Sequence, residues 1–325
     1  MLALGRLAGA GGNVGGAAAA YFGDRAVSVR GVDDGNARRI DYFDITTTGS
    51  AALFGLTIAD NRSGAEAVSG EGRGVVAGGT ASGGTINDSI EYFTFATTGN
   101  TTSFGDLTGI RRGHASASDG VRGMFAGGTD VAGSGGNAKL ASIDYITIAT
   151  TGNAADFGDL TVSRQDFGGV SNGVRGIFAA GTITGYGTSN AERTNVIDYV
   201  TIATTGNAVD YGDYVNNNKA MSSSSNSTRG IFAGGFTDNG SGSKIAADHI
   251  GYLELNTTGN AATFGSLLVE SFICNGTGNS TRAVFITIEQ NSNKLQYVSY
   301  ATTANSAAFG SAGTNSYEAS AISGD

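Results

Sequence analysis

The chain lacks proline and tryptophan, and it has a single cysteine, Cys274, in 325 residues. One cysteine excludes an intrachain disulfide and any cysteine-based metal cluster. Because proline is a common means of stiffening loops, its absence leaves the 54 glycines to make the turns. We therefore expect a fold that is held together by side-chain packing and main-chain pairing.

Charged residues are also scarce. They make up 14% of the chain, against roughly 25% in an average globular protein. The 28 acidic and 19 basic residues give a net charge of −9 without any Lys/Arg block, which argues against nucleic acid as a partner. No apolar run approaches the roughly 18 residues of a membrane span. Gly5, Arg6 and Gly9 interrupt the opening apolar segment, which argues against a cleaved secretory signal.

The chain repeats one unit six times. In each copy a tyrosine is followed by a second aromatic residue, with a Thr-Thr-Gly-Asn-like turn between them. A period of about 50 residues is typical of a supersecondary unit stacked on copies of itself. We expect one repeat domain over residues 16–325, preceded by a Gly/Ala-rich arm over residues 1–15. The aromatic pairs are Tyr42/Phe54, Tyr92/Phe104, Tyr145/Phe157, Tyr199/Tyr211, Tyr252/Phe264 and Tyr297/Phe309.

Each unit contains four short strand-like segments. An Arg-led apolar run ending in small residues, such as Arg122–Gly128, predicts a strand buried on both faces. An alternating segment with the tyrosine, such as Ile143–Ile148, predicts a second strand, and Phe157–Leu160 and Phe167–Ser171 predict two more. Glycine and asparagine in the intervening turn both tolerate left-handed backbone angles. Without any helical periodicity, this pattern predicts an all-β, six-bladed β-propeller with four antiparallel strands per blade.

A propeller must join its first and last blades, because open strand edges invite aggregation. The C-terminal Tyr317–Gly324 resembles the small-residue strand that elsewhere precedes the Arg-led strand, so it fits beside Arg25–Val29. Gly16–Phe22 fits the same place. We favour an arrangement in which both termini meet in one blade and residues 1–15 reach a neighbouring subunit.

The repeat resembles the kelch motif, in which an apolar strand ending in Gly-Gly precedes a variable loop, a Tyr-bearing strand and a downstream aromatic residue. The resemblance covers residues from about 20 to 325, with Phe or Tyr where kelch blades usually have Trp. The amino-acid sequence of Ile143–Leu160 also resembles tandem repeats in structural and tail-associated proteins of bacteriophages.

The phage resemblance implies a non-enzymatic virion protein of the tail, fibre or capsid exterior, acting in assembly or host-surface attachment. Its expected partners are other virion structural proteins, a host surface glycan and further copies of itself. The alternative is a secreted or cell-surface carbohydrate-binding or adhesin propeller of a bacterium. A propeller enzyme is the third hypothesis, and it would require convergent His, Tyr or acidic residues outside the repeated positions.

The sequence predicts no catalytic, cofactor-binding or metal site. His114 and His249 occupy non-equivalent repeat positions, which is typical of polar residues with a structural role. The repeated acids of Ile-Asp-Tyr and Phe-Gly-Asp-Leu recur once per blade, too far apart to converge on one metal or substrate. We expect them to make turn or cross-strand bonds. The repeated arginines are expected to pair with those acids or with carbonyls, or else to line the channel. These residues are Asp41, Asp106, Asp144, Asp159, Asp198 and Asp213, and Arg25, Arg73, Arg122, Arg175, Arg229 and Arg282.

The loops after the double glycine differ from copy to copy. Variable loops on one face of a repeated scaffold are a usual place for recognition, although neutral drift would produce the same variation. These loops span Thr80–Ser89, Thr129–Ser142, Thr182–Val196 and Phe236–His249, and their binding candidates are Asn137, Tyr186, Asn190 and Asn239.

Overall fold

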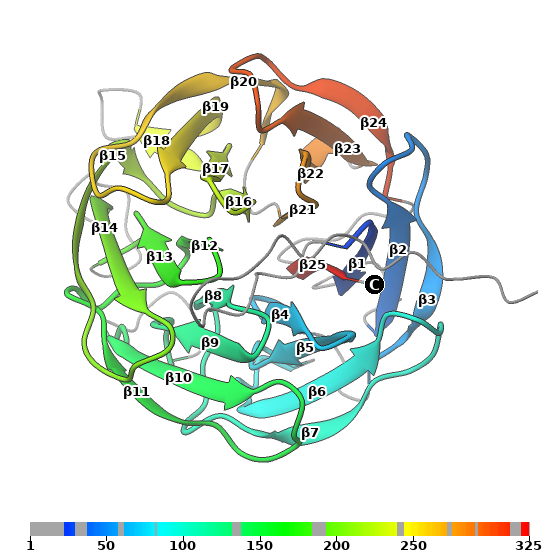
Figure 1. The fold of residues 1–325 in the computed structure, drawn as a ribbon, viewed down its shortest axis with the longest axis vertical. Helices are drawn as coiled ribbons and strands as arrows, with labels where there is room; N and C mark the ends of the chain where they lie inside the picture. Colours follow the sequence, from blue (N-terminus) through cyan, green and yellow to red (C-terminus); the bar gives the residue numbers. More distant parts are fainter. Residues whose placement is uncertain are drawn as a thin grey trace, which may run out of the picture.

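The computed structural model shows an all-β chain arranged as six sheets around a central axis (Figure 1). The architecture is the predicted six-bladed β-propeller with four antiparallel strands per blade, and the described residues contain no helix. The structure describes residues 23–29, 38–57, 62–81, 83–131, 138–183, 193–238, 244–271, 275–289, 292–312 and 320–324.

Blades 1 to 3 each contain four strands, which follow one another from the axis outward. Blade 1 consists of β25 (Ser320–Gly324), β1 (Arg25–Val29), β2 (Arg39–Asp44) and β3 (Ala52–Leu56). Blade 2 consists of β4 (Glu66–Gly70), β5 (Arg73–Ala77), β6 (Ser89–Thr94) and β7 (Thr102–Asp106). Blade 3 consists of β8 (Ala115–Ser118), β9 (Arg122–Ala126), β10 (Ser142–Thr147) and β11 (Ala155–Asp159).

Blades 4 to 6 follow the same order, with one added strand. Blade 4 consists of β12 (Gly168–Ser171), β13 (Arg175–Ala179), β14 (Thr194–Thr201) and β15 (Val209–Asn218). Blade 5 consists of β16 (Ser222–Ser225), β17 (Arg229–Ala233), β19 (Lys244–Glu254) and β20 (Ala262–Ser271), and β18 (Phe236–Asp238) also pairs with β19. Blade 6 consists of β21 (Asn275–Gly278), β22 (Arg282–Glu289), β23 (Ser292–Ser299) and β24 (Ala307–Ser311).

The C-terminal strand closes the ring. β25 pairs antiparallel with β1, from Arg25 opposite Gly324 to Val29 opposite Ser320. The first and last parts of the described chain therefore share blade 1, as the sequence predicted. The competing segment Gly16–Phe22 and the arm over residues 1–15 lie outside the described residues.

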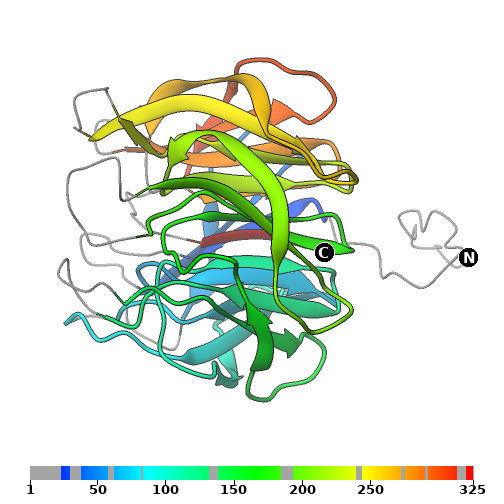
Figure 2. The same cartoon turned by 90° about the vertical axis from the view of Figure 1, so that its left-hand side faces the viewer.

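The strands run between two faces of the propeller, as the side view shows (Figure 2). In blades 2 to 5 the second strand ends in the small-residue pair and leads into the variable loop, as at Gly127-Gly128. We call this side the loop face. The Thr-Thr-Gly turns and the short turns after the inner strands lie on the opposite side, which we call the turn face.

The hydrophobic core lies between consecutive blades. One cluster combines Val68 and Phe104 of blade 2 with Phe125 and Ile146 of blade 3. Each repeated tyrosine meets its partner aromatic edge to face, as in Tyr145 and Phe157, whose ring centroids are 5.8 Å apart. These pairs are therefore core contacts, and each well-buried aromatic side chain contributes about 1.5–3 kcal/mol before entropy.

The Thr-Thr-Gly-Asn turn clamps one blade to the preceding one. Asn153 Oδ1 accepts a hydrogen bond from the Asp106 N–H of the preceding blade at 3.1 Å, and Asn207 accepts from Asp159 in the same way. None of these asparagines has a positive φ, so the tolerance of left-handed angles noted from the sequence is not used by them. Their side chains are instead acceptors for the neighbouring outer strand. Ser50 stands at this position in the first copy.

The glycine of Phe-Gly-Asp is required by the same contact. A Cβ at Gly105 would lie 2.2 Å from the Gly152 carbonyl oxygen of the next blade, whereas a Cβ at Gly109 would meet nothing within 4 Å. We expect Gly105→Ala to lower the free energy of unfolding by about 1–3 kcal/mol, because the two blades must move apart. Gly109→Ala should have little effect. Urea unfolding of both variants measures the difference, and equal midpoints would contradict the packing argument.

Five of the repeated arginines, Arg25, Arg73, Arg122, Arg229 and Arg282, join their blade to the next at the turn face, whereas Nη1 of Arg175 has no hydrogen-bond partner among the described residues. Arg122 stacks on Tyr145 of its own blade, with 5.1 Å between the guanidinium carbon and the ring centroid. Its Nη1 donates to the Ile202 and Ala203 carbonyls of blade 4 at 3.0 and 2.9 Å. Arg73 and Arg282 repeat this arrangement at their own junctions. The expectation of carbonyl partners is confirmed for these arginines.

Candidate functional site

Three further arginines form buried ion pairs at the loop-face side of blades 2 to 4. The pairs are Arg62–Glu91 at 2.7 Å, Arg111–Asp144 at 2.8 Å and Arg164–Asp198 at 2.7 Å. Asp144 and Asp198 were expected to make turn or cross-strand bonds, or to pair with the arginines that open the repeat. Their ionic partners are instead the arginines of the linkers between blades.

A β-bulge between the third and fourth strands of the blade positions the carboxylate of each ion pair. The register between these strands shifts at the same step in every blade, and in blades 1 to 4 an acid follows this step, as at Ile143/Asp144 and Ile197/Asp198. A bulge redirects a side chain, and here the carboxylate meets the linker that enters its blade. Asp198 accepts hydrogen bonds from Thr161 N–H and from Arg164. Burial lowers the pKa of Arg164 to about 10, so this guanidinium remains charged at neutral pH. These pairs therefore have a structural role.

The two histidines lie in different surroundings. His114 is 1% exposed and packs edge to face on Phe125, and neither ring nitrogen has a hydrogen-bond partner among the described residues. Burial, with Arg111 and Arg62 nearby, holds its pKa far below the usual value, so the ring is neutral. His249 is half-buried beside Tyr214 in blade 5. The structure does not bring the two histidines together, and His114 acts as an aromatic core residue.

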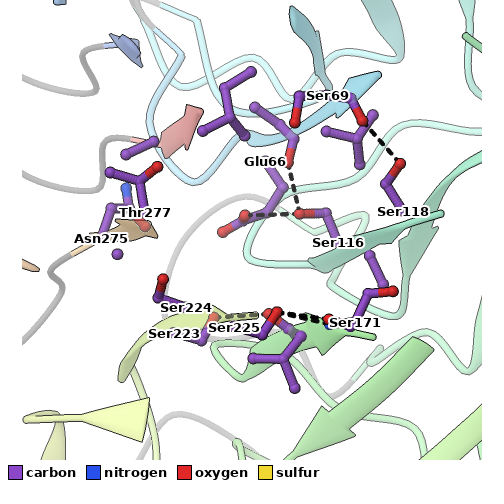
Figure 3. A pocket seen from close by; sticks show the side chains of 18 of the residues that line it. Glu66, Ser69, Ser116, Ser118, Ser171, Ser223, Ser224, Ser225, Asn275 and Thr277 are labelled. Atoms are coloured by element: carbon purple, nitrogen blue, oxygen red, sulfur yellow. Dashed lines mark hydrogen bonds between the residues drawn. The ribbon is translucent and has the colours of Figure 1, made fainter. Parts of the chain in front are cut away.

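The innermost strands of the six blades enclose a channel on the axis of the propeller, with a cavity volume of about 140 Å³. Small residues make up most of its wall, and hydroxyl groups from several blades face one another across it (Figure 3). The polar side chains of the wall come from Glu66, Ser69, Ser116, Ser118, Ser171, Ser223, Ser224, Ser225, Asn275, Thr277 and Ser323.

The serine hydroxyls of the wall are bonded across the blade junctions. Ser116 and Ser118 of β8 donate to the Ala67 and Ser69 carbonyls of β4 at 2.8 and 3.0 Å. Ser223 of β16 donates to the Gly169 carbonyl of β12 at 2.9 Å. Each hydroxyl has one hydrogen to donate, and here it goes to the neighbouring blade. Ser118 Oγ also accepts a hydrogen bond from the Gly120 N–H at 2.9 Å, so the oxygen lone pairs of Ser116 and Ser223 are what this wall offers to a ligand.

Among the described residues that line this wall, Glu66 is the single ionisable side chain. It lies at the start of β4, hence near the loop face, and its Oε2 is 3.3 Å from Ser116 Oγ, which shares its one hydrogen between this carboxyl and the Ala67 carbonyl. Burial raises the pKa of the Glu66 carboxyl to about 8, against the lowering effect of hydrogen bonds from Ser116 and the Ala67 N–H. The corresponding residue is Ala115 in blade 3 and Gly168 in blade 4. The acid is therefore a departure from the repeat.

The raised pKa makes stability depend on pH. The strands packed around Glu66 place no free charge beside it. β8 and β25 have no ionisable residue, and the one on β5, Arg73, lies at the turn-face end of that strand. Arg62 is paired with Glu91. Between pH 4.5 and about 8 the folded state retains a proton on Glu66 that the unfolded state releases. The contribution of Glu66 to the free energy of unfolding therefore falls as pH rises through this window.

We expect Glu66→Gln to remove this dependence. Urea midpoints of wild type and variant, measured at pH 5, 6.5, 8 and 9, should diverge progressively up to pH 8 in favour of the variant and then run parallel. A constant difference over the whole range would contradict the assignment of a buried, proton-retaining carboxyl.

The loop candidates Asn137, Tyr186, Asn190 and Asn239 lie outside the described residues. The ends of those loops are described, and they are anchored to the linkers between blades. Thr129 bridges Arg112 and Lys139, and Thr182 bridges Gln165 and Arg193. No group of three or more His, Cys, Asp or Glu side chains suited to a metal ion occurs in the part of the chain that the structure describes. That part also contains no helix long and apolar enough to cross a membrane.

No protein-family model matches this sequence, and no curated protein is significantly similar to it. The family assignment therefore goes no further than the architecture, a six-bladed β-propeller that is compatible with kelch-like repeats.

Proposed function

We propose that the protein is a non-enzymatic structural component of a bacteriophage particle, on the tail, a fibre or the capsid exterior, with a role in assembly or host-surface attachment. The similarity of the repeat sequence to repeats of phage structural and tail-associated proteins supports the assignment to a virion. Other virion proteins, and further copies of this chain, are then its partners. A host surface glycan is the partner expected for attachment.

The hydrogen bonds made by the repeated polar side chains support the non-enzymatic part of the proposal. Arg122, Asn153 and Asp198 each bond to a neighbouring blade or to the linker entering their own. Ser116 does the same at the axis. The chemistry that recurs from blade to blade thus serves to fix the blades relative to one another, as expected of a rigid scaffold that presents its variable loops.

Electron microscopy of phage particles tests the proposal. Antibodies raised against the recombinant propeller should decorate one fixed position on particles purified by density gradient, and the protein should occur there at constant copy number. Pre-incubating host cells with the propeller should reduce particle adsorption if the role is attachment, and leave it unchanged if the role is assembly. Particles that contain none of the protein would rule out the virion assignment.

A groove between blades 5 and 6 favours carbohydrate binding as a second candidate. It has a volume of about 470 Å³ on the turn face and is lined by polar groups that include Arg229, Glu254 and Ser299. Arg229 Nε pairs with Glu254 Oε1 at 2.8 Å, and Glu254 is 52% exposed, so the pair presents both donors and acceptors to sugar hydroxyls. A glycan array with the isolated propeller and a Glu254→Gln variant tests this hypothesis: binding lost in the variant would support it.

A further inference from the structure

The charge of the axial channel favours a cationic ligand. Glu66 is the one ionisable group among the residues that line it, and no charged neighbour contributes to its pKa. None of the described residues therefore provides a counter-ion for the Glu66 carboxylate. Since a buried charge is costly unless it is paired, a ligand with one positive charge would stabilise the ionised form.

The hydrogen bonds within the channel wall indicate that this ligand is a hydrogen-bond donor. The hydroxyl hydrogen of Ser223 is directed to a main-chain carbonyl, and that of Ser116 is directed to the Ala67 carbonyl and to Glu66 itself. The oxygens of these two serines, together with the carboxylate, are therefore acceptors. Thr277 of β21 lines the same channel (Figure 3), is 4% exposed, and has no hydrogen-bond partner for Oγ1 among the described residues. A ligand with several N–H groups matches this set.

The rest of the wall is apolar and narrow. Val68, Val170 and Ile322 lie among the serines, so the channel offers alkyl contact as well as acceptors. The volume of about 140 Å³ corresponds to roughly ten water molecules at 10–15 Å³ each. That space suits a compact head group with a short alkyl chain.

We propose that the channel binds a primary alkylammonium group, with Glu66 as its counter-ion and the serine oxygens as acceptors of its N–H groups. The group comes from a short free amine or from a lysine side chain of a partner protein. One carboxylate balances one ammonium charge, whereas Ca²⁺ needs six to eight oxygen ligands. This site goes beyond the proposed function and does not depend on it, because it rests on the axis of the isolated propeller.

Calorimetric titration of the full chain at pH 9 and constant ionic strength tests the site. The probes are propylammonium, Nα-acetyl-lysine amide, potassium and tetramethylammonium chlorides. We expect heat from propylammonium and none above background from tetramethylammonium, which lacks N–H donors. Binding of the lysine derivative as well as propylammonium would show that the site accepts a lysine side chain, and binding of propylammonium alone would assign it to free amines. Potassium binding as tight as propylammonium would overturn the proposal.

Two glutamate variants locate the binding. Glu66→Gln should weaken propylammonium binding about 10- to 100-fold, because a charge-assisted bond becomes a neutral one. Glu270→Gln, in the outer strand β20, should bind like wild type. In wild type, affinity should rise about tenfold per pH unit from pH 6 to 8, because proton and ammonium compete for one carboxylate.

The unsubstituted protein provides an independent measurement. The carboxyl carbon resonance of Glu66 should titrate at lower pH when propylammonium is added. An unchanged titration, or undiminished binding by Glu66→Gln, would overturn the proposal.

Discussion

Replacing Asp198 by alanine is expected to lower the free energy of unfolding by about 3–5 kcal/mol. Asp198 and Arg164 are both fully buried, with 0% of either side chain exposed. Removing the carboxylate leaves the Arg164 guanidinium without its counter-ion and the Thr161 N–H without its acceptor. An uncompensated buried charge is among the costliest defects in a folded protein. Urea unfolding at neutral pH, monitored by tyrosine fluorescence, measures the loss.

The chain itself contains a version of this region without the pair. In blade 5, Asn218 stands where blade 4 has Arg164, and Gly251 stands where it has Asp198. Tyr214, in place of Leu160, fills the space: a Cβ at Gly251 would lie 2.6 Å from its hydroxyl oxygen. That hydroxyl donates to the Phe232 carbonyl at 3.2 Å. The arginine, its carboxylate partner and the volume that they occupy are thus all replaced together in blade 5.

Transferring the blade 5 arrangement to blade 4 tests this explanation. The triple variant Leu160→Tyr, Arg164→Asn, Asp198→Gly should recover most of the stability that Asp198→Ala loses, because no buried charge is left unpaired. The exposed Asp213→Ala is the control and should change stability by less than about 0.5 kcal/mol. A loss below about 1 kcal/mol for Asp198→Ala, or a triple variant less stable than the single one, would contradict the argument.

The repeat made the architecture predictable. The unit of tyrosine, turn and second aromatic residue occurs six times, with Val-, Ile- and Phe-rich segments between glycines. A ring of six blades buries the apolar side chains of all six copies in the same way. The match of Tyr317–Gly324 to the small-residue strand identified the closing strand, and the observed pairing is β25 with β1. The side-chain hydrogen bond of the turn asparagine was not predicted, because local backbone preference does not show that the side chain reaches the preceding blade.

The buried ion pairs were available from the sequence by comparing the copies. Arg62, Arg111 and Arg164 occur with Glu91, Asp144 and Asp198, and the blades with Asn218 or Ser271 at the arginine position have Gly251 or Gln296 at the acid position. Linker arginine and acid are thus lost together in blades 5 and 6, whereas blade 1 keeps the acid Asp41 and pairs it with Arg39 of the same strand at 2.7 Å. Glu66 was not predictable in this way, since nothing in its segment shows that the side chain faces the axis. Only the pairing of β4 with β5 and the packing of β8 against it place it there.

Deleting residues 320–325 is expected to have the largest effect of all. β25 supplies five paired residues to β1, Ile322 belongs to a core cluster with Val27 and Val76 of blades 1 and 2, and Ser323 donates a hydrogen bond to the Gly278 carbonyl of blade 6. The strand thus joins three blades. Loss of one buried side chain and several main-chain bonds should cost roughly 5 kcal/mol or more, a large part of the roughly 5–15 kcal/mol typical of a folded protein.

The truncated chain should also associate with itself, because the free edge of β1 and the exposed flank of β4 are templates for further strands. Size-exclusion chromatography should show oligomers, and the unfolding transition should broaden. Adding a synthetic peptide of residues 313–325 in trans should restore the monomer and the cooperative transition, whereas the same peptide with Ile322→Asp should not, since a carboxylate would enter the blade 1–2 core. A truncated chain that stays monomeric with an unchanged midpoint would show that the ring does not need its closing strand, and the rigid-scaffold interpretation would lose its physical basis.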